Sequence, residues 1–119
     1  MKLVLAALLL VGACSKKDDA PTGQRPVPIP TAERQRGADA CKVYIDRACA
    51  CAKAHADRAE VAKRCELDAA LPSAMELALG IDDEPNVAAE DVFRAQTEAR
   101  KVISTCIEGA NWLTTHGCP

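Results

Sequence analysis

The stretch from Cys41 to Cys51, CKVYIDRACAC, carries three of the seven cysteines of this 119-residue chain. Three further cysteines, Cys65, Cys106 and Cys118, are spread over the rest of the sequence. Apolar residues in and after the stretch recur at spacings of three, four and seven, which predicts one buried face of a helix. This helix is therefore placed to be tied covalently to everything that follows it.

The composition indicates a small and weak core. Hydrophobic residues make up 49% of the chain, but many are alanines, and the aromatic residues are limited to Tyr44, Phe93 and Trp112. Small secreted domains of this kind usually depend on disulfides for stability. The formal net charge of −2 offers no basic excess, so we do not expect nucleic acid as a partner.

The N-terminus has the pattern of an export signal. Lys2 precedes the apolar run Leu3–Val11, which is too short for a permanent membrane helix, and the run leads into V-G-A-C, ending at Cys14. Over residues 1–14 alone, this pattern resembles the lipobox of bacterial lipoprotein precursors. The resemblance implies a signal peptide of residues 1–13, a diacylglycerol thioether on Cys14, and a fatty acyl group such as palmitate on the new amine. The alternative is an ordinary signal peptide with an incidental cysteine.

The same resemblance bears on localisation. Ser15 stands after Cys14, where an aspartate would favour retention in the inner membrane of enteric-type bacteria. The family rule therefore favours the outer membrane, with the protein facing the periplasm or the cell surface. The membrane is the expected partner through the lipid on Cys14.

Residues 14–31 are predicted to be a proline-rich tether. Pro21, Pro26, Pro28 and Pro30 disfavour both helix and sheet, and alternating prolines favour polyproline II. A spacer of this kind reaches up to about 50 Å. The folded domain is expected to cover residues 32–119.

We expect this domain to be all-α. Gly37 is predicted to interrupt a lead-in, so the first firm helix starts near Ala38. A second helix follows a cap at Asp57 and ends near Ala70, before Pro72. Residues 73–79 form a short extra helix stopped by Gly80, residues 81–87 form a loop, and a third long helix is capped by Asn86. The predicted architecture is a small up-down-up three-helix bundle with this short extra helix, stapled by disulfides.

If lipid occupies Cys14, six cysteines remain to pair in an oxidising compartment. Spacing alone leaves the pairing open, but heights along the predicted bundle favour one arrangement. It joins Cys41 to Cys106, Cys49 to Cys65, and Cys51 to Cys118. The nearest competitor exchanges the partners of Cys49 and Cys51.

The sequence contains three other candidate sites. Cys51, His55, His116 and Cys118 gather at one end of the predicted bundle and could form a zinc or copper site. Cys49-Ala50-Cys51 could be a redox-active pair, although it lacks the C-x-x-C spacing of dithiol oxidoreductases. The acidic run from Asp82 resembles the start of a calcium loop, but it lacks the glycine and the closing glutamate, so a solvated acidic loop is favoured.

The sequence contains no recognisable combination of nucleophile and base, and it suggests no cofactor or small-molecule substrate. We therefore expect a non-enzymatic, lipid-anchored protein of the cell envelope that is structural or binds an envelope protein partner. A metal-binding envelope lipoprotein is the alternative, and a thiol redox factor is a weaker one.

Overall fold

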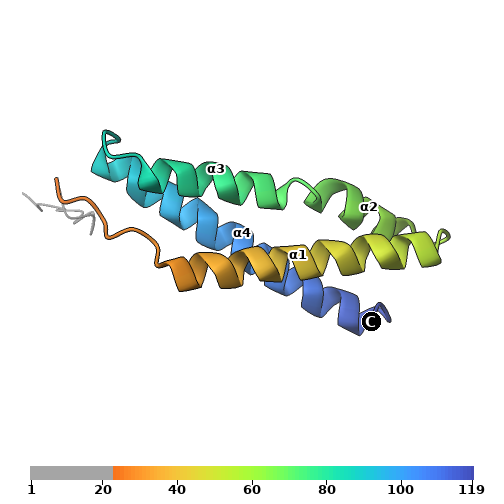
Figure 1. The fold of residues 1–119 in the computed structure, drawn as a ribbon. Coiled ribbons are helices and arrows are strands. Elements are labelled where there is room, and N and C mark those ends of the chain that lie inside the picture. Colours follow the sequence, from red (N-terminus) through yellow and green to blue (C-terminus); the bar gives the residue numbers. More distant parts are fainter. Residues whose placement is uncertain (1–22) are drawn as a thin grey trace, which may run out of the picture.

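The computed structural model describes residues 23–119, which form four helices and, within that range, no strand. Figure 1 shows the long helices α1 and α4 side by side, with the shorter α2 and α3 following one another along them. The all-α class is confirmed. The helices are α1 (Thr31–Ala54), α2 (Ala59–Asp68), α3 (Leu71–Asp83) and α4 (Ala89–Thr115).

Helix α1 begins earlier than predicted. It runs without a break through Gly37, which is buried against α4. A glycine inside a helix costs about 1 kcal/mol relative to alanine, which is why the sequence suggested an interruption. Here a Cβ would collide with the side chain of Ile103, so the glycine permits close packing of α1 on α4. Tertiary packing outweighs the local preference.

The middle of the chain also differs in part from the prediction. Pro72 stands in the first turn of α3, as expected of a residue that ends one helix and begins another. The helix after it is not short, however: α3 continues past Gly80 to Asp83 because Ala78 and Asp82 are both buried on its inner face. The predicted loop therefore starts only at Glu84.

The predicted helix caps are wrong. Arg58 rather than Asp57 precedes α2, and Ala88 rather than Asn86 precedes α4. Neither of these residues makes a capping side-chain hydrogen bond. Both helices therefore start without a side-chain cap, an interaction that typically contributes about 1 kcal/mol.

Contacts between α1 and α4 advance along both helices together. Glu33 pairs with Arg100, Cys41 with Cys106, and Arg47 with Thr114. The two helices therefore lie parallel and in close contact. Close contact is also seen at Gly109, where a Cβ would collide with the ring of Tyr44.

Two clusters of buried residues hold the helices together. The smaller one contains Ile29, Ala78 and Ala99, with Leu79 packed against it. The larger one lies around Tyr44, the largest side chain that is fully buried. Its members are Cys41, Tyr44, Ala48, Cys51, Val61, Cys106, Leu113 and Cys118.

The segment before α1 is part of the packed structure. Ile29 is 3% exposed, and residues from Arg25 onward are hydrogen-bonded to α3, the loop after it, or α4. Residues 25–30, which were predicted to belong to the tether, therefore pack against the helical domain. Among residues 23–119, no helix combines the length and the hydropathy needed to cross a membrane.

Candidate functional site

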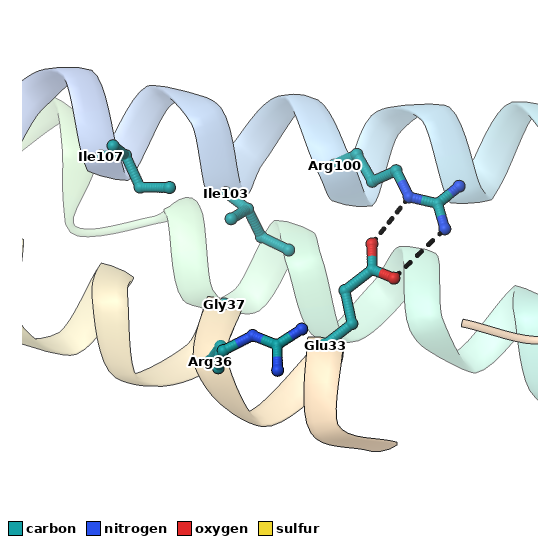
Figure 2. A pocket seen from close by; sticks show the side chains of 6 residues that line it. All are labelled: Glu33, Arg36, Gly37, Arg100, Ile103 and Ile107. Carbon is teal, nitrogen blue, oxygen red and sulfur yellow. Dashed lines mark hydrogen bonds and ion pairs between the residues drawn. The ribbon is translucent and has the colours of Figure 1, made fainter. Parts of the chain in front are cut away.

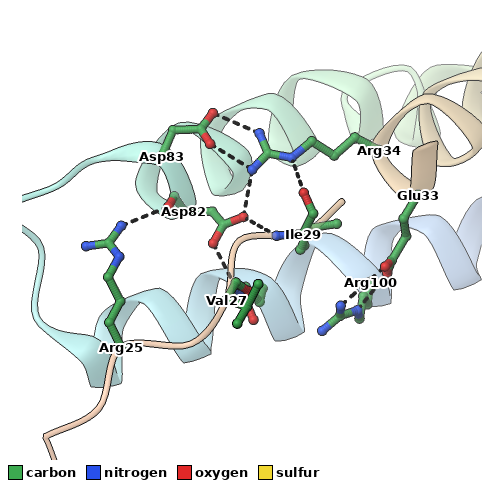
Figure 3. Close-up of polar contacts among 9 residues, drawn as sticks. Arg25, Val27, Ile29, Glu33, Arg34, Asp82, Asp83 and Arg100 are labelled. Carbon is green, nitrogen blue, oxygen red and sulfur yellow. Dashed lines mark hydrogen bonds and ion pairs between the residues drawn. The ribbon is translucent and has the colours of Figure 1, made fainter. Parts of the chain in front are cut away.

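The most elaborate polar site holds residues 25–30, which we call the strap, against α3 and α4 (Figure 3). The backbone N–H of Ile29 donates to Asp82 Oδ2 at 2.9 Å, and the carbonyl of Val27 accepts from Gln96 Nε2 at 2.8 Å. Arg25 Nη2 donates to the backbone carbonyl of Asp82 at 2.8 Å. Prolines alternate with these residues and lack N–H groups, so only a few backbone groups remain to be satisfied.

Asp82 is the centre of the site. Its residue is 1% exposed, and its two carboxylate oxygens accept from three donors. Oδ2 accepts from Ile29 N and from Arg34 Nη2 at 2.8 Å, while Oδ1 accepts from Gln96 Nε2 at 2.8 Å. A buried carboxylate is stable only when it is paired and hydrogen-bonded in this way. Among residues 23–119 no buried side-chain nitrogen or oxygen lacks a partner.

Arg34 joins the start of α1 to the same site. Its guanidinium donates to both oxygens of Asp83, at 2.8 and 2.7 Å, and its Nε donates to the carbonyl of Ile29 at 2.9 Å. The hydrogen bond from Arg34 lowers the pKa of the Asp83 carboxyl, and the same pairing raises the pKa of Arg34. One arginine thus links the strap, α1 and the end of α3.

The prediction of a solvated acidic loop is wrong for Asp82. Asp83 is exposed, as expected, but Asp82 is buried. The signal that could have revealed this is the spacing of Met75, Ala78 and Asp82, which lie on one buried face of α3. That face could be recognised only if the helix was continued beyond Gly80.

The second feature is the set of three disulfides, which joins Cys41 to Cys106, Cys49 to Cys65, and Cys51 to Cys118. These are the pairs favoured from helix heights. The Cα atoms are 4.8, 4.8 and 5.7 Å apart, within the usual range for disulfides. Each bond ties α1 to a different downstream segment.

This pairing removes the thiolates of the alternative metal site. Cys51 and Cys118 are bonded to each other, and His116 stacks on Trp112 with ring centroids 3.9 Å apart. Nδ1 of His116 also lies 2.7 Å from the carbonyl of Trp112. No group of three or more potential metal ligands comes together in the part of the chain that the structure describes.

Aromatic and charged side chains cluster near the disulfides. The guanidinium of Arg64 lies over the ring of Trp112, 4.0 Å from its centroid. The phenol of buried Tyr44 donates a hydrogen bond to Asp68. Burial, and then the hydrogen bond to Asp68, raise the pKa of Tyr44. These contacts stabilise the packing of α2 on α1 and α4, and none of them creates a nucleophile.

A shallow hollow of about 240 Å³ lies between α1 and α4 (Figure 2). Ile103 and Ile107 form its apolar part, and the ion pair of Glu33 with Arg100 lies at one end, with oxygen and nitrogen 2.8 Å apart. The hydrogen bond from Arg100 lowers the pKa of Glu33. With its carboxylate ionised and paired, Glu33 is poorly suited to act as a general base, and no nucleophile lines the hollow.

Cys14, the predicted lipidation site, lies outside the described residues. No family model, no curated protein and no solved structure matches this chain significantly.

Proposed function

We propose that this protein is a lipid-anchored module of the bacterial cell envelope, held in the outer membrane through Cys14. The observation that carries the proposal is the sequence V-G-A-C at the end of the short apolar run Leu3–Val11. The three disulfides support it, because such bonds persist in oxidising compartments and are rare in the cytosol. The role proposed is non-enzymatic: structural, or binding of an envelope protein.

The architecture proposed for the module is an up-down-up bundle in which α2 and α3 together form the middle leg. The disulfide between Cys49 and Cys65 and the hydrogen bond from Tyr44 to Asp68 support an antiparallel arrangement of α2 and α1. The hydrogen bond from Gln96 to Asp82, together with the shared cluster of Ala78 and Ala99, supports an antiparallel arrangement of α4 and α3. A bundle of this kind presents rigid helical faces, which can serve as protein-binding surfaces.

The test of anchoring is the intact mass of protein extracted from membranes of a bacterial host. We expect the chain to start at Cys14 and to carry a diacylglyceryl group, with or without an added acyl chain. The Cys14→Ala variant, which leaves every other cysteine in place, should lack both the cleavage before residue 14 and the lipid. A soluble wild-type product with a free Cys14 thiol would refute the proposal.

The metal-binding alternative has its own test. Titration of thiols under denaturing conditions without a reductant should find none among Cys41, Cys49, Cys51, Cys65, Cys106 and Cys118. Peptide mapping without reduction should recover the helix α1 cysteines linked to all three downstream cysteines. Two free thiols released together with stoichiometric zinc would transfer the proposal to metal binding.

A further inference from the structure

We infer that the strap sets the orientation of the domain on the bilayer, with the end of the bundle that contains the α3–α4 loop turned toward the membrane. This inference rests on the proposed anchor at Cys14 and adds to it the face that the membrane meets. It follows from where the strap is held and from how little chain remains between that point and the lipid.

The strap leaves the bundle at one extreme end. Arg25 donates to the carbonyls of Asp82 and Val87, which lie at the end of α3 and in the loop before α4. Figure 1 shows the strap continuing beyond α1 toward this loop, whereas the C-terminus lies at the opposite end of the molecule. The chain toward Cys14 therefore departs beside the α3–α4 loop.

Docking of the strap shortens the length of chain between the folded domain and Cys14, which we call the leash. Eleven residue steps separate Cys14 from Arg25, which span at most about 40 Å when fully extended. If the strap were free, the leash would extend to Thr31 and could reach about 60 Å, and it would start further from the tip. Trp112 lies 24 residues beyond Ala88 along the chain, or about 36 Å along α4. The leash therefore limits the α3–α4 loop to about 40 Å from the lipid, whereas Trp112 can lie up to about 36 Å farther away. On average, the α3–α4 loop is the part nearer to the bilayer.

The strap is held by contacts that a spacer does not need. Ile29 is buried against Ala78 and Ala99, and its N–H uses an oxygen of buried Asp82. Nε2 of Gln96 donates hydrogen bonds to both Asp82 Oδ1 and the carbonyl of Val27, each at 2.8 Å. A free tether would leave these groups without partners, at the cost of burying unsatisfied polar atoms. The bundle end is thus built around the strap.

Charge at this end disfavours its insertion into an anionic surface. The exposed carboxylates there are Asp83, Glu84, Glu90 and Asp91, of which Arg34 and Arg94 neutralise part. An acidic end is repelled by anionic headgroups within about a Debye length. The inferred geometry, which follows from the point where the strap leaves the bundle and not from charge, is therefore a domain whose strap end faces the membrane without inserting into it and whose disulfide-linked end is directed outward.

The sole tryptophan provides the test. The lipidated full-length product is reconstituted in phosphatidylcholine vesicles that carry a dansyl headgroup acceptor, and energy transfer from tryptophan is measured. Wild type reports the position of Trp112. The double variant Phe93→Trp/Trp112→Phe moves the donor to an exposed position in the second turn of α4. We expect transfer about twofold or more higher from position 93, because the two positions are about 28 Å apart along the helix.

Strap variants make the test specific. Ile29→Ala removes the buried strap side chain and should reduce the ratio of the two transfer efficiencies. The matched control is Val27→Ala: the Val27 side chain is 85% exposed, and its only contact in the site comes from its backbone carbonyl, so the ratio should not change. If Trp112→Phe fails to fold by circular dichroism, Phe93→Trp in the wild-type background should still raise the transfer per tryptophan.

The outcomes separate this inference from the proposed function. Protein without lipid on Cys14 would refute both. Lipidated, vesicle-bound protein with equal transfer from positions 93 and 112, or with higher transfer from Trp112, would refute the orientation alone. An unchanged ratio in Ile29→Ala would show that the strap does not set the orientation.

Discussion

The two ends of this bundle are stabilised by different means. At one end, four disulfide-bonded cysteines, Cys41, Cys51, Cys106 and Cys118, are themselves members of the cluster around Tyr44. At the other end, Ile29, Ala78 and Ala99 form a smaller buried apolar cluster, and among residues 23–119 no disulfide reaches it. The polar site of Asp82 joins the elements there.

Disulfides at one end and a buried carboxylate at the other hold the helices of this alanine-rich chain together. Alanine buries little area, and a large apolar side chain contributes only about 1.5–3 kcal/mol on burial. Covalent bonds supply the missing stability at the Tyr44 end. At the strap end, one buried carboxylate connects the strap, α1, α3 and α4 through Ile29, Arg34 and Gln96. Four predictions test this contrast.

The largest effect is expected from removing the long-range disulfide. Cys41→Ala/Cys106→Ala opens a loop of 65 residues, and the chain-entropy argument gives a loss of about 4 kcal/mol in the free energy of unfolding. Cys49→Ala/Cys65→Ala opens a loop of only 16 residues, and we expect a loss of about 3 kcal/mol in the free energy of unfolding. Urea unfolding of both pairs provides the measurement. A larger loss for the shorter loop would mean that packing, not chain entropy, dominates at this end.

The next effect concerns the buried carboxylate. Asp82→Ala leaves Ile29 N–H and Gln96 without their acceptor, and we expect a loss of about 2–3 kcal/mol. The exchange of the Ile29 amide hydrogen, followed by NMR, should accelerate at the same time. Asp83→Ala is the matched control, because this exposed carboxylate pairs with the same Arg34, and solvent screening should make its loss of stability clearly smaller than that of Asp82→Ala. Equal losses of stability in the two variants would show that buried Asp82 contributes no more than exposed Asp83.

A third effect probes close packing at the Tyr44 end. Gly109→Ala places a Cβ against the Tyr44 ring, and such overpacking costs about 1–3 kcal/mol. Gly80→Ala is the control at the strap end, since a Cβ there would meet nothing within 4 Å. Because alanine is the better helix former, Gly80→Ala should stabilise by up to about 1 kcal/mol. Thermal unfolding of the two variants checks the opposite signs, and stabilisation by Gly109→Ala would contradict the close contact.

The smallest effect at neutral pH concerns Tyr44, the only tyrosine of the chain. Its phenol should titrate above the ordinary pKa of 10.0 in the folded protein and return to that value in denaturant. Because the folded state favours the neutral phenol, its contribution to stability is complete below pH 10.0 and is lost as pH rises through the raised pKa. Near-ultraviolet absorbance of the phenolate measures both states.

Asp68→Asn sharpens the same test. It removes the negative charge that opposes the phenolate, so the pKa of Tyr44 should fall relative to wild type. It should remain above the ordinary value, because burial is the largest cause of the shift. If the Tyr44 phenol of the folded wild type titrated with the pKa that it has in denaturant, the phenol would be accessible to water.

Much of the fold could be predicted from local patterns. The helical period after Cys41 predicted the all-α class, and Pro72 predicted the break before α3. The predicted ends were less accurate. Gly37 and Gly80 indicated breaks because glycine is costly in a helix. Both helices nevertheless continue past these glycines, because residues on their inner faces are buried. Propensity is local, whereas this burial depends on residues far away in the sequence.

The candidate sites divide in the same way. The expected export signal and lipid anchor are linear patterns, and they can be recognised without any knowledge of the fold. The site of Asp82 could not be recognised, because its partners Ile29, Arg34 and Gln96 lie 53, 48 and 14 residues away along the chain. No spacing rule connects residues at such separations until the helices are placed.

The helical class, the positions of the cysteines and the alternating prolines of the strap can be read from the chain, because each depends on residue type or on a short repeat. The docking of the strap and the burial of Asp82 can be seen only in the folded molecule. Both depend on one face of α3 meeting α4 and residues 25–30. Proline alternation favours an extended chain wherever it lies, but whether that chain packs is decided by the surface that receives it.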